Sequence, residues 1–560
     1  MKKIRFIKIS FLVRNELVLL VLVLSLLLML SGAGYAQQEI RAIRHNVATG
    51  FNIDPCVALG WTSSIGILNL YDSLVFPDPE QDVRPSLAKS WEISEDGRTF
   101  TFELVPGVKF HNGDELTSED VVFSMERYLT IGEGYGYLYT ENVKEAKVLD
   151  KYKFQITLKR DFGPFLASLV RFYILNKNQI MANIKEGPYG EFGDYGKNWL
   201  VTNDAGSGPY LVKEIRTEEH LLLEKFNDYW AGWENENAPD YVKMIGTTEP
   251  ITIRTLMSRG ELELTDPWQS KEALASLDQL PGVEIATLLI GCPLEIMFNT
   301  KKPPSDDIHF RKALGYCVDY DQVVNKILPG SPRSVVVPPD TPAFNPNLEP
   351  YEFDLAKAEE ELKKSPYYGK LDQYPFELHY DAYCPDREKI ALMLQANAAK
   401  IGINIEVVKS SFVIFANVMA QIETTPTSLI MGVCPHYAEA GSLLSSRYHS
   451  SACGTWEQGE WLQDPEIDAM IEDALATLDK EERFQKYYDI QEKLYELFPT
   501  IWLVSEAAMQ AYRSDYIVDP AVEAKKQGKP SNIVMGYNYY YRDFKVTPEK
   551  AQPPYTPFKP

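Results

Sequence analysis

With 560 residues, the chain is too long for a single hydrophobic core, and we expect two or more lobes. Its formal net charge of −23 at pH 7 favours solubility and repels nucleic acid and anionic membrane surfaces. The composition therefore argues against a nucleic-acid partner, while a charge of this size does not identify a ligand.

The first predicted element is a secretory signal peptide over residues 1–36. Five basic side chains come first, the apolar run Leu17–Leu30 follows, and small residues then lead into a polar segment. Gly34 and Ala36 suit the −3 and −1 positions of a cleavage site. We expect a mature chain that begins near Gln37, carries a formal charge of −27 and is located in the periplasm or outside the cell.

A retained membrane anchor is the alternative interpretation of this segment. The apolar run is shorter than the about 20 residues that span a bilayer, so cleavage is favoured. No cysteine lies near the junction, which argues against a lipid-anchored mature N-terminus. The sequence contains no second long apolar segment, and we expect the mature chain to be soluble.

Alternating and amphipathic patterns predict strands and helices along the rest of the chain. In residues 98–105 the side chains of Phe100, Phe102 and Leu104 point to one face, which is typical of a strand. A turn follows, and Thr117 with Asp120 is close to a capping box at the start of a helix.

The second half of the sequence continues this alternation. Asp386 is expected to cap a helix that ends at Gly402, where the chain enters the alternating strand INIEVV. Residues 352–365 and 465–497 are expected to form long amphipathic helices. Helix followed by strand indicates an α/β fold, and the lack of a low-complexity linker predicts that strands join the lobes.

Six cysteines raise the question of disulfides and metal binding. An exported protein can oxidise them, and their spacings match no zinc pattern, so we expect no metal site. The sequence leaves the pairing open: a local disulfide between the nearest pair, Cys434 and Cys453, is one hypothesis, and buried free thiols are expected for the others. The six are Cys56, Cys292, Cys317, Cys384, Cys434 and Cys453.

The motifs of common enzymes are missing from the sequence. There is no HExxH, no GxSxG, no Walker A loop and no GxGxxG after a strand, and the seven histidines are scattered. We therefore expect no catalytic residues and no cofactor. A secreted hydrolase, or a receptor without transport partners, remains the rival from another functional class.

Four stretches together resemble one known family. RPSLAKSWEISEDGRTFTFELVPGVKFHNGDELTSEDVVFSMER (residues 84–127) combines an LA-x-SW element, a GVKFHxG turn and a TxEDV helix start. GSGPY, NDYW and SRGELELT lie within residues 206–265, DDIHFRKALGYCVDYDQVV covers residues 306–324, and DPEIDAMIEDALATL with its continuation to IWL covers residues 464–503. These motifs resemble the bacterial extracellular solute-binding proteins of family 5, the oligopeptide- and dipeptide-binding components of ABC importers.

The resemblance implies an α/β fold with mixed sheets, the two-lobed periplasmic binding protein of type II (large cluster, with an extra subdomain) with a hinge between its lobes. Lobe I would comprise residues 37–288, lobe II residues 289–505, and residues 506–560 would return to lobe I. The resemblance also implies a monomer that captures a small solute, a peptide or an oligosaccharide, and delivers it to an ABC permease and its ATPase.

The resemblance also suggests where the ligand binds, and the sequence departs from the family there. A family segment that reads roughly G-W-C-A-D-Y-N-E-P pairs with the ligand as an added strand, and its Asp binds the ligand's ammonium group. The corresponding residues here include Gly432, Val433, Cys434, His436 and Glu439, with His436 in place of the Asp. A neutral histidine does not neutralise a buried ammonium, so this departure puts ordinary peptide binding in question.

Aromatic side chains complete the predicted site. Tyr137 lies in the glycine-containing segment GEGYGYLY, and Trp268 follows the GELELT element; similar positions line the family's pocket. Aromatic faces suit sugars as well as apolar side chains. Glu439 as a substitute acid, or a different ligand such as an oligosaccharide, a metal chelate or an opine, are the alternatives to an ordinary peptide.

Overall fold

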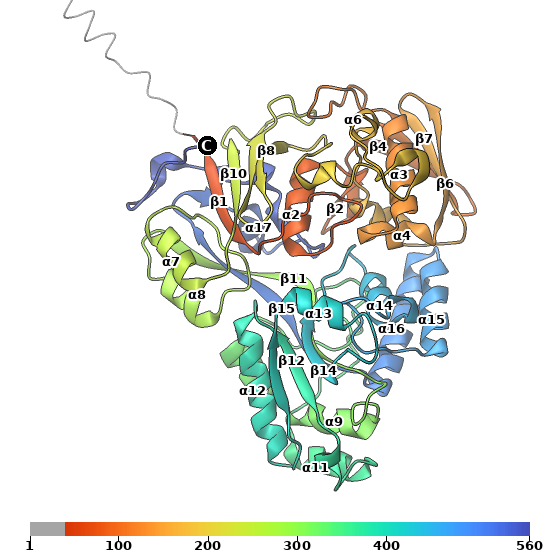
Figure 1. The fold of residues 1–560 in the computed structure, drawn as a ribbon, viewed down its shortest axis with the longest axis vertical. Helices are drawn as coiled ribbons and strands as arrows, with labels where there is room; N and C mark the ends of the chain where they lie inside the picture. The colour runs from red at the N-terminus through yellow and green to blue at the C-terminus, as the bar shows by residue number, and fades with distance from the viewer. Residues whose placement is uncertain (1–39) are drawn as a thin grey trace, which may run out of the picture. The chain divides into compact units, whose positions relative to one another are not determined.

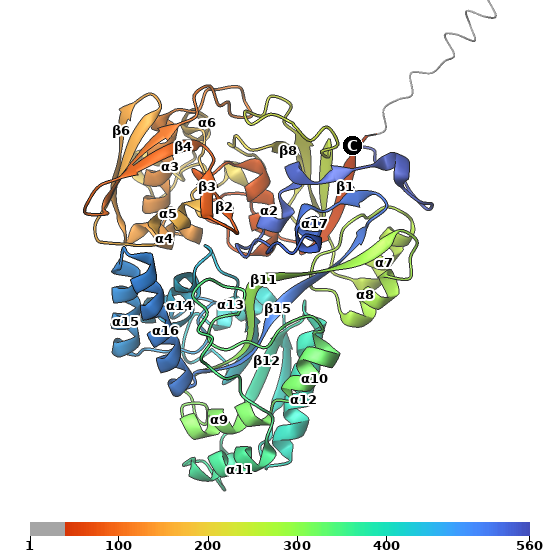
Figure 2. The ribbon, with the colours of Figure 1, turned by 180° about the vertical axis from the view of Figure 1, so that it is seen from behind.

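The computed structural model describes residues 40–560, so the predicted signal peptide lies outside the described residues. Residues Arg41–Thr556 form one compact unit, drawn from two sides in Figures 1 and 2. This unit contains two large hydrophobic cores, one built mainly from residues before 292 and after 508, the other from residues 294–504. None of the helices within residues 40–560 combines the length and the apolar character that crossing a bilayer requires.

Two four-stranded sheets and several helices surround the first core, in the upper half of Figure 1. One sheet has the order β1-β10-β9-β8, in which only the β1–β10 pair is parallel. The other has the order β4-β5-β7-β6 and is antiparallel throughout. The strands are β1 (Ala42–Val47), β4 (Ala88–Ile93), β5 (Thr99–Leu104), β6 (Val143–Asp150), β7 (Lys153–Leu158), β8 (Tyr210–Arg216), β9 (His220–Lys225) and β10 (Tyr241–Gly246). The helices are α2 (Trp61–Leu70), α3 (Ser118–Ile131), α4 (Tyr137–Thr140), α5 (Phe165–Ser168) and α6 (Lys177–Ala182).

A five-stranded mixed sheet of order β13-β12-β14-β11-β15 lies at the second core. β12 is parallel to both β13 and β14, while β11 is antiparallel to β14 and β15. The strands are β11 (Val283–Phe298), β12 (Glu377–Asp381), β13 (Glu406–Ser410), β14 (Ser428–Gly432) and β15 (Thr500–Arg513). The longer helices are α9 (Ile308–Cys317), α11 (Leu355–Lys364), α12 (Pro385–Ala399), α14 (Ala440–Tyr448), α15 (Pro465–Ala476) and α16 (Lys480–Leu497).

The long strands β11 and β15 take part in both cores. Their pairing runs from Val283 opposite Arg513 to Met297 opposite Thr500. Within β11, Cys292 belongs to the first core and Leu294 to the second. Two further helices, α7 (Pro250–Ser258) and α8 (Lys271–Leu277), form a small third cluster with the outer ends of these strands. We therefore propose that the chain passes between the lobes inside β11 and β15, close to the predicted borders.

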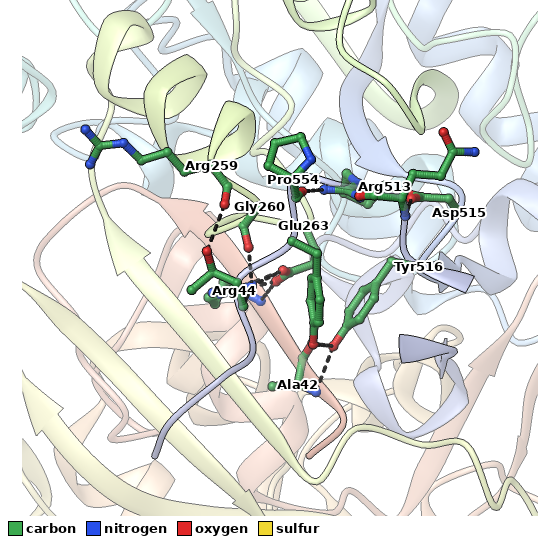
Figure 3. A network of polar contacts seen from close by, with 12 residues as sticks. Ala42, Arg44, Arg259, Gly260, Glu263, Arg513, Asp515, Tyr516 and Pro554 are labelled. Carbon is green, nitrogen blue, oxygen red and sulfur yellow. Dashed lines mark hydrogen bonds and ion pairs between the residues drawn. The ribbon is translucent and has the colours of Figure 1, made fainter. Parts of the chain in front are cut away.

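The C-terminal tail is bound back to the first strand by a polar network (Figure 3). Arg44 on β1 forms a buried ion pair with Glu263 and donates to the carbonyl oxygens of Gly260 at 2.7 Å and Thr556 at 3.0 Å. The Tyr516 hydroxyl donates to the Ala42 carbonyl at 3.0 Å. Segments far apart in the sequence thus share one set of hydrogen bonds, which joins the return segment to the first core.

Most of the predicted elements are present, but three predictions are corrected. Residues 465–497 form two helices, α15 and α16, separated at residues 477–479, and α12 ends at Ala399, before Gly402. Phe100, Phe102 and Leu104 are buried in β5, and Thr117 forms a capping box with Asp120 at the start of α3. The start of α12 also differs. The N-cap of α12 is Cys384, whereas the sequence predicted Asp386. The helix begins at Pro385, because the fixed φ and the missing N–H of proline are tolerated at the first helical position. Gly402 has the predicted left-handed φ of 87°.

The cysteine hypothesis is wrong: Cys434 forms its disulfide with Cys292, at a sequence separation of 142. Leu294 opposes Gly432 in the antiparallel β11–β14 pair, so the same register carried two residues farther places Cys292 opposite Cys434. The thiol of Cys453 instead donates to Gln458 Oε1 at 2.8 Å. Only the strand register brings the two bonded cysteines together.

Removing this disulfide should destabilise the protein. Replacing both Cys292 and Cys434 by Ser should lower the free energy of unfolding by about 2–5 kcal/mol, because the unfolded chain gains the freedom of a long loop. Urea unfolding under oxidising conditions measures the change, with Cys453→Ser as the control that keeps the disulfide. Equal midpoints for the double variant and the wild type would contradict the assignment.

A buried charge cluster lies inside the second core. Arg447 on α14 pairs with both Glu295 on β11 and Glu460, and all three side chains are at most 1% exposed. The Thr500 hydroxyl donates to Glu460 at 2.6 Å. Burial raises the pKa of Glu295 to about 7, and repulsion from Glu460 adds to the rise while Arg447 opposes it. At low pH the folded protein therefore holds a proton on Glu295.

This proton should make stability depend on pH. Between about pH 4.5 and 7 the unfolded chain has released the proton that the folded chain keeps, so the free energy of unfolding falls as pH rises. Glu295→Gln should remove a contribution of up to about 1.4 kcal/mol per pH unit. Urea unfolding of both proteins across this range isolates the difference, and Glu481→Gln on the exposed surface of α16 is the control. If the difference in unfolding free energy between the wild type and Glu295→Gln did not change with pH, the prediction would be contradicted.

Candidate functional site

A cavity of about 610 Å³ lies between segments that belong to the two different cores. From the first core it is lined by the residues around α4 and by residues 160–162; from the second, by α14, the segment 451–457 and the end of α15. Both ribbon views place α4 next to the α14 and α15 region. The volume is within the range of pockets that hold small organic ligands.

His436 lies at the contact between the two sides. Its side chain is buried, and its ring meets the rings of Tyr135 and Tyr137 edge to face at centroid distances of 5.2 and 5.7 Å. Nδ1 is hydrogen-bonded to the Tyr137 hydroxyl, and Nε2 is 3.2 Å from Glu457 Oε1. Tyr137 and Glu457 therefore contact opposite nitrogens of the His436 ring.

The backbone of His436 is held as firmly as its ring. Its N–H donates to the Ser442 hydroxyl at 2.8 Å, and its carbonyl accepts from Arg171 Nε at 3.0 Å. Arg171 is fully buried in the first core and also donates to the Met535 carbonyl at 2.8 Å. His436 is thus held in place behind the cavity lining, where its side chain contacts the lining residues Tyr137 and Glu457.

Tyr137 and Glu457 both line the cavity, and sequence reasoning missed Glu457. The Glu457 side chain is 7% exposed. The neighbouring Trp456 also lines the cavity, with its ring 5.3 Å from that of Phe412. The sequence WEQGEW carries no motif, and only the fold brings Glu457 to His436. The only local signal in the sequence is that the acid Glu457 follows the aromatic residue Trp456.

Glu439 is two residues from the cavity-lining residue Tyr437, but its carboxylate forms an ion pair away from the cavity. Its carboxylate accepts from Arg483 Nε on α16 at 2.5 Å, and both side chains are buried. Burial raises the pKa of Glu439, while Arg483 opposes the rise. The ion pair joins α16 to the start of α14, and it leaves Glu439 outside the cavity lining.

The other three predicted residues of this segment, Gly432, Val433 and Cys434, do not line the cavity. Val433 is 1% exposed in the second core, and Cys434 is in the disulfide. Gly432 ends β14, where an added Cβ would lie 3.1 Å from a Glu506 carboxylate oxygen and 3.2 Å from Arg387. The segment 432–439 therefore positions His436, and His436 contacts two cavity residues.

Trp268 lies at a second contact, away from the cavity lining. Its ring is 5.5 Å from the ring of Trp61 and 6.0 Å from the Arg387 guanidinium. Asp266 accepts from the Trp268 N–H at 2.8 Å, and burial raises the pKa of Asp266 to about 6. The structure thus separates Trp268 from the other predicted aromatic residue, Tyr137. No cluster of three potential metal ligands is present within residues 40–560.

Replacing His436 by Asp tests this geometry. The new carboxylate would face Glu457 across the position of the imidazole, and like charges in a buried site repel. We expect the free energy of unfolding to fall by about 2–4 kcal/mol. His436→Asn, which keeps a neutral hydrogen-bonding group, should cost less. Thermal and urea unfolding measure both variants, and an unchanged stability of His436→Asp would place the residue in solvent.

A family model describing the bacterial extracellular solute-binding proteins, family 5 Middle, matches residues 82–452. The dipeptide-binding protein of Escherichia coli (strain K12) is 26% identical over 536 residues, covering 89% of this chain and 95% of that protein. Heme-binding protein A of Haemophilus influenzae is 27% identical over 467 residues, covering 77% of this chain and 81% of that protein. The predicted family resemblance is confirmed.

Solved structures show the same fold. The DppA protein of Helicobacter pylori in complex with the peptide STSA has a TM-score of 0.75 at 22% identity, covering 92% of this chain and 100% of that chain. NikZ from Campylobacter jejuni in complex with Ni(L-His) has a TM-score of 0.74 at 19% identity, covering 90% of this chain and 99% of that chain. The predicted two-lobed α/β fold of periplasmic binding proteins is confirmed.

Proposed function

This chain belongs to family 5 of the bacterial extracellular solute-binding proteins, and from that premise we propose that it captures a solute in the cavity between its cores and delivers it to an ABC permease and its ATPase. The protein would act outside the cytoplasm, after cleavage of residues 1–36, as a monomer. The family and the relatives are solute-binding proteins rather than enzymes.

The single observation that carries the proposal is the cavity between residues of the two cores, with few polar contacts across it. The Gly163 N–H donates to the Leu475 carbonyl at 2.8 Å, and Lys480 pairs with Asp82 at 2.5 Å on the surface. Two buried contacts also involve His436: its ring is hydrogen-bonded to the Tyr137 hydroxyl, and its carbonyl accepts from Arg171 Nε at 3.0 Å. The exposed Lys480–Asp82 pair contributes little, so a hinge motion within β11 and β15 would break that pair at small cost.

A peptide is the first candidate ligand, because the relatives include dipeptide-binding proteins. The second candidate is a non-peptide solute such as an oligosaccharide or a metal chelate. Two observations favour keeping it: His436 stands where the family segment has an acid, and the aromatic rings of Tyr137 and Trp456 line the cavity. Both candidates require the same closure of the lobes.

Bound solute should compact the protein. Native mass spectrometry of purified protein identifies a co-purified solute, and small-angle scattering before and after its removal should give a smaller radius of gyration for the loaded form. A solute bound with no change in the radius of gyration would contradict the hinge.

A cavity-filling variant locates the binding site. Ala452→Phe adds a ring to the cavity lining and should lower affinity for the co-purified solute at least tenfold, since the cavity loses volume to the new side chain. Ala275→Phe on the exposed face of α8 is the matched control and should bind normally. Calorimetric titration measures both, and equal affinities would move the site elsewhere.

A further inference from the structure

The turn between α15 and α16 (residues 477–479) meets the first core beside the cavity. Its neighbours Leu475 and Ala476 line the cavity from the second core, as Phe162 does from the first. The Leu475 side chain packs against both cores. Both ribbon views show these ends of α15 and α16 close to α4 and β6. The turn is therefore one of the places where the two cores touch.

The end of α15 leaves carbonyl groups that need donors from outside the helix, because the last four carbonyls of an α-helix have no intrahelical partner. Two of them accept from Thr477: its hydroxyl donates to the Asp473 carbonyl at 2.8 Å, and its N–H donates to the Ala474 carbonyl at 3.1 Å. The next carbonyl, of Leu475, accepts from the Gly163 N–H at 2.8 Å. The end of α15 is thus completed by a donor from the segment that follows β7.

Gly163 permits this contact because it has no side chain. A Cβ at this position would overlap the Thr477 carbonyl oxygen and lie 2.6 Å from Arg483 Nη1. The oxygen belongs to the backbone, so no change of rotamer relieves the overlap. Gly163 is not among the glycines with a positive φ, so space and not backbone conformation requires the glycine. Alanine at position 163 is therefore compatible only with a turn that has moved away.

Arg483 fixes the shape of the turn from within the second core. Its Nη1 donates to the carbonyls of Thr477 at 2.9 Å and Leu478 at 3.2 Å, and its Nε donates to Glu439 at 2.5 Å. Glu439 is the N-cap of α14, three residues after His436. The turn therefore presents a preformed backbone to the first core, which lowers the entropic cost of docking.

Two surface contacts accompany the backbone hydrogen bond. Lys480, the first residue of α16, pairs with Asp82 at 2.5 Å, and both side chains are about half exposed. The Leu478 side chain, 45% exposed, lies against Gly97 of the first core. Exposed contacts of this kind are individually weak, so the whole set can form and separate reversibly.

We propose that Gly163 and the turn 477–479 form a closure latch: the turn docks on the Gly163 N–H when the lobes close and leaves it when they open. This proposal rests on the proposed function and adds a positioning residue to it. Gly163 does not line the cavity, so it acts on the balance between open and closed forms and not on the contacts of a solute.

Carbodiimide coupling of Lys480 to Asp82 tests the latch, because this reagent joins an amine directly to a carboxylate that it contacts. Mass spectrometry of the full protein as purified measures the coupled product relative to Lys151–Glu115, a pair at 2.8 Å that lies within the first half of the chain. We expect the wild type to give the product. Gly163→Ala should lower its yield at least about fivefold, because overpacking at the contact opposes closure.

Matched variants control for the substitutions themselves. Gly66→Ala should keep the wild-type yield, because its Cβ would meet only the ends of the Leu221 and Ile53 side chains, at 3.2 and 3.6 Å. Leu478→Ala changes an exposed position, so it keeps the fold, and should lower the yield about twofold or more by removing apolar contact. Leu392→Ala, at 47% exposure on α12, is its control and should couple normally.

Unfolding distinguishes a latch from a glycine that only packs. Urea unfolding of Gly163→Ala, freed of co-purified solute, should give the wild-type midpoint, because opening the lobes relieves the overlap with the turn. A glycine with a merely structural role would lower that midpoint when replaced by alanine. A lowered midpoint therefore overturns the latch.

The coupling outcomes also separate the latch from the proposed function. If the wild type forms no Lys480–Asp82 product, or if either Gly163→Ala or Leu478→Ala couples as well as the wild type, the latch is overturned while solute capture in the cavity stands. Solute capture itself fails only if binding of the co-purified solute is insensitive to Ala452→Phe.

Discussion

The pairing of β11 with β15 is the constraint on which the rest of the structure depends. These two strands stay hydrogen-bonded along their length while their side chains pass from the first core into the second. Their register is interrupted between Leu289 and Cys292, where Gly291 has a φ of 67°. Such an irregularity bends a strand, and it lies close to the border between the cores. The positions of α4 and α14 around the cavity follow from this crossing.

Buried charges stabilise each core internally, away from the cavity. Arg127 makes a bidentate pair with Asp54 at 2.6 Å inside the first core, and Arg447 joins two glutamates inside the second. Breaking a buried pair of this kind by removing one partner is costly. The Lys480–Asp82 pair, which joins segments of the two cores, is different: both side chains are about half exposed. This contrast is what a hinged binding protein needs, because ligand contacts then decide the balance between open and closed forms.

The disulfide adds a second connection at the same crossing. Cys434, after β14, lies two residues before His436, so its bond to Cys292 on β11 holds the start of the segment that contacts Glu457. His436 is in turn fixed through its backbone by Ser442 and Arg171. The residue behind the cavity lining is therefore held in place, which under the proposed function would lower the entropic cost of binding a solute.

The sequence by itself determined the family, the fold class and the local structure. Alternation placed Phe100 and Phe102 in a strand, and Thr117 with Asp120 specified a helix start, because these features depend on neighbours within a few residues. The tertiary structure alone decided which distant residues meet beside the cavity. The partner of Cys434 lies 142 residues away, and the Tyr137–His436–Glu457 contact joins segments separated by 299 and 21 residues. Strand register and core packing bring such residues together, and neither leaves a periodic pattern in the chain.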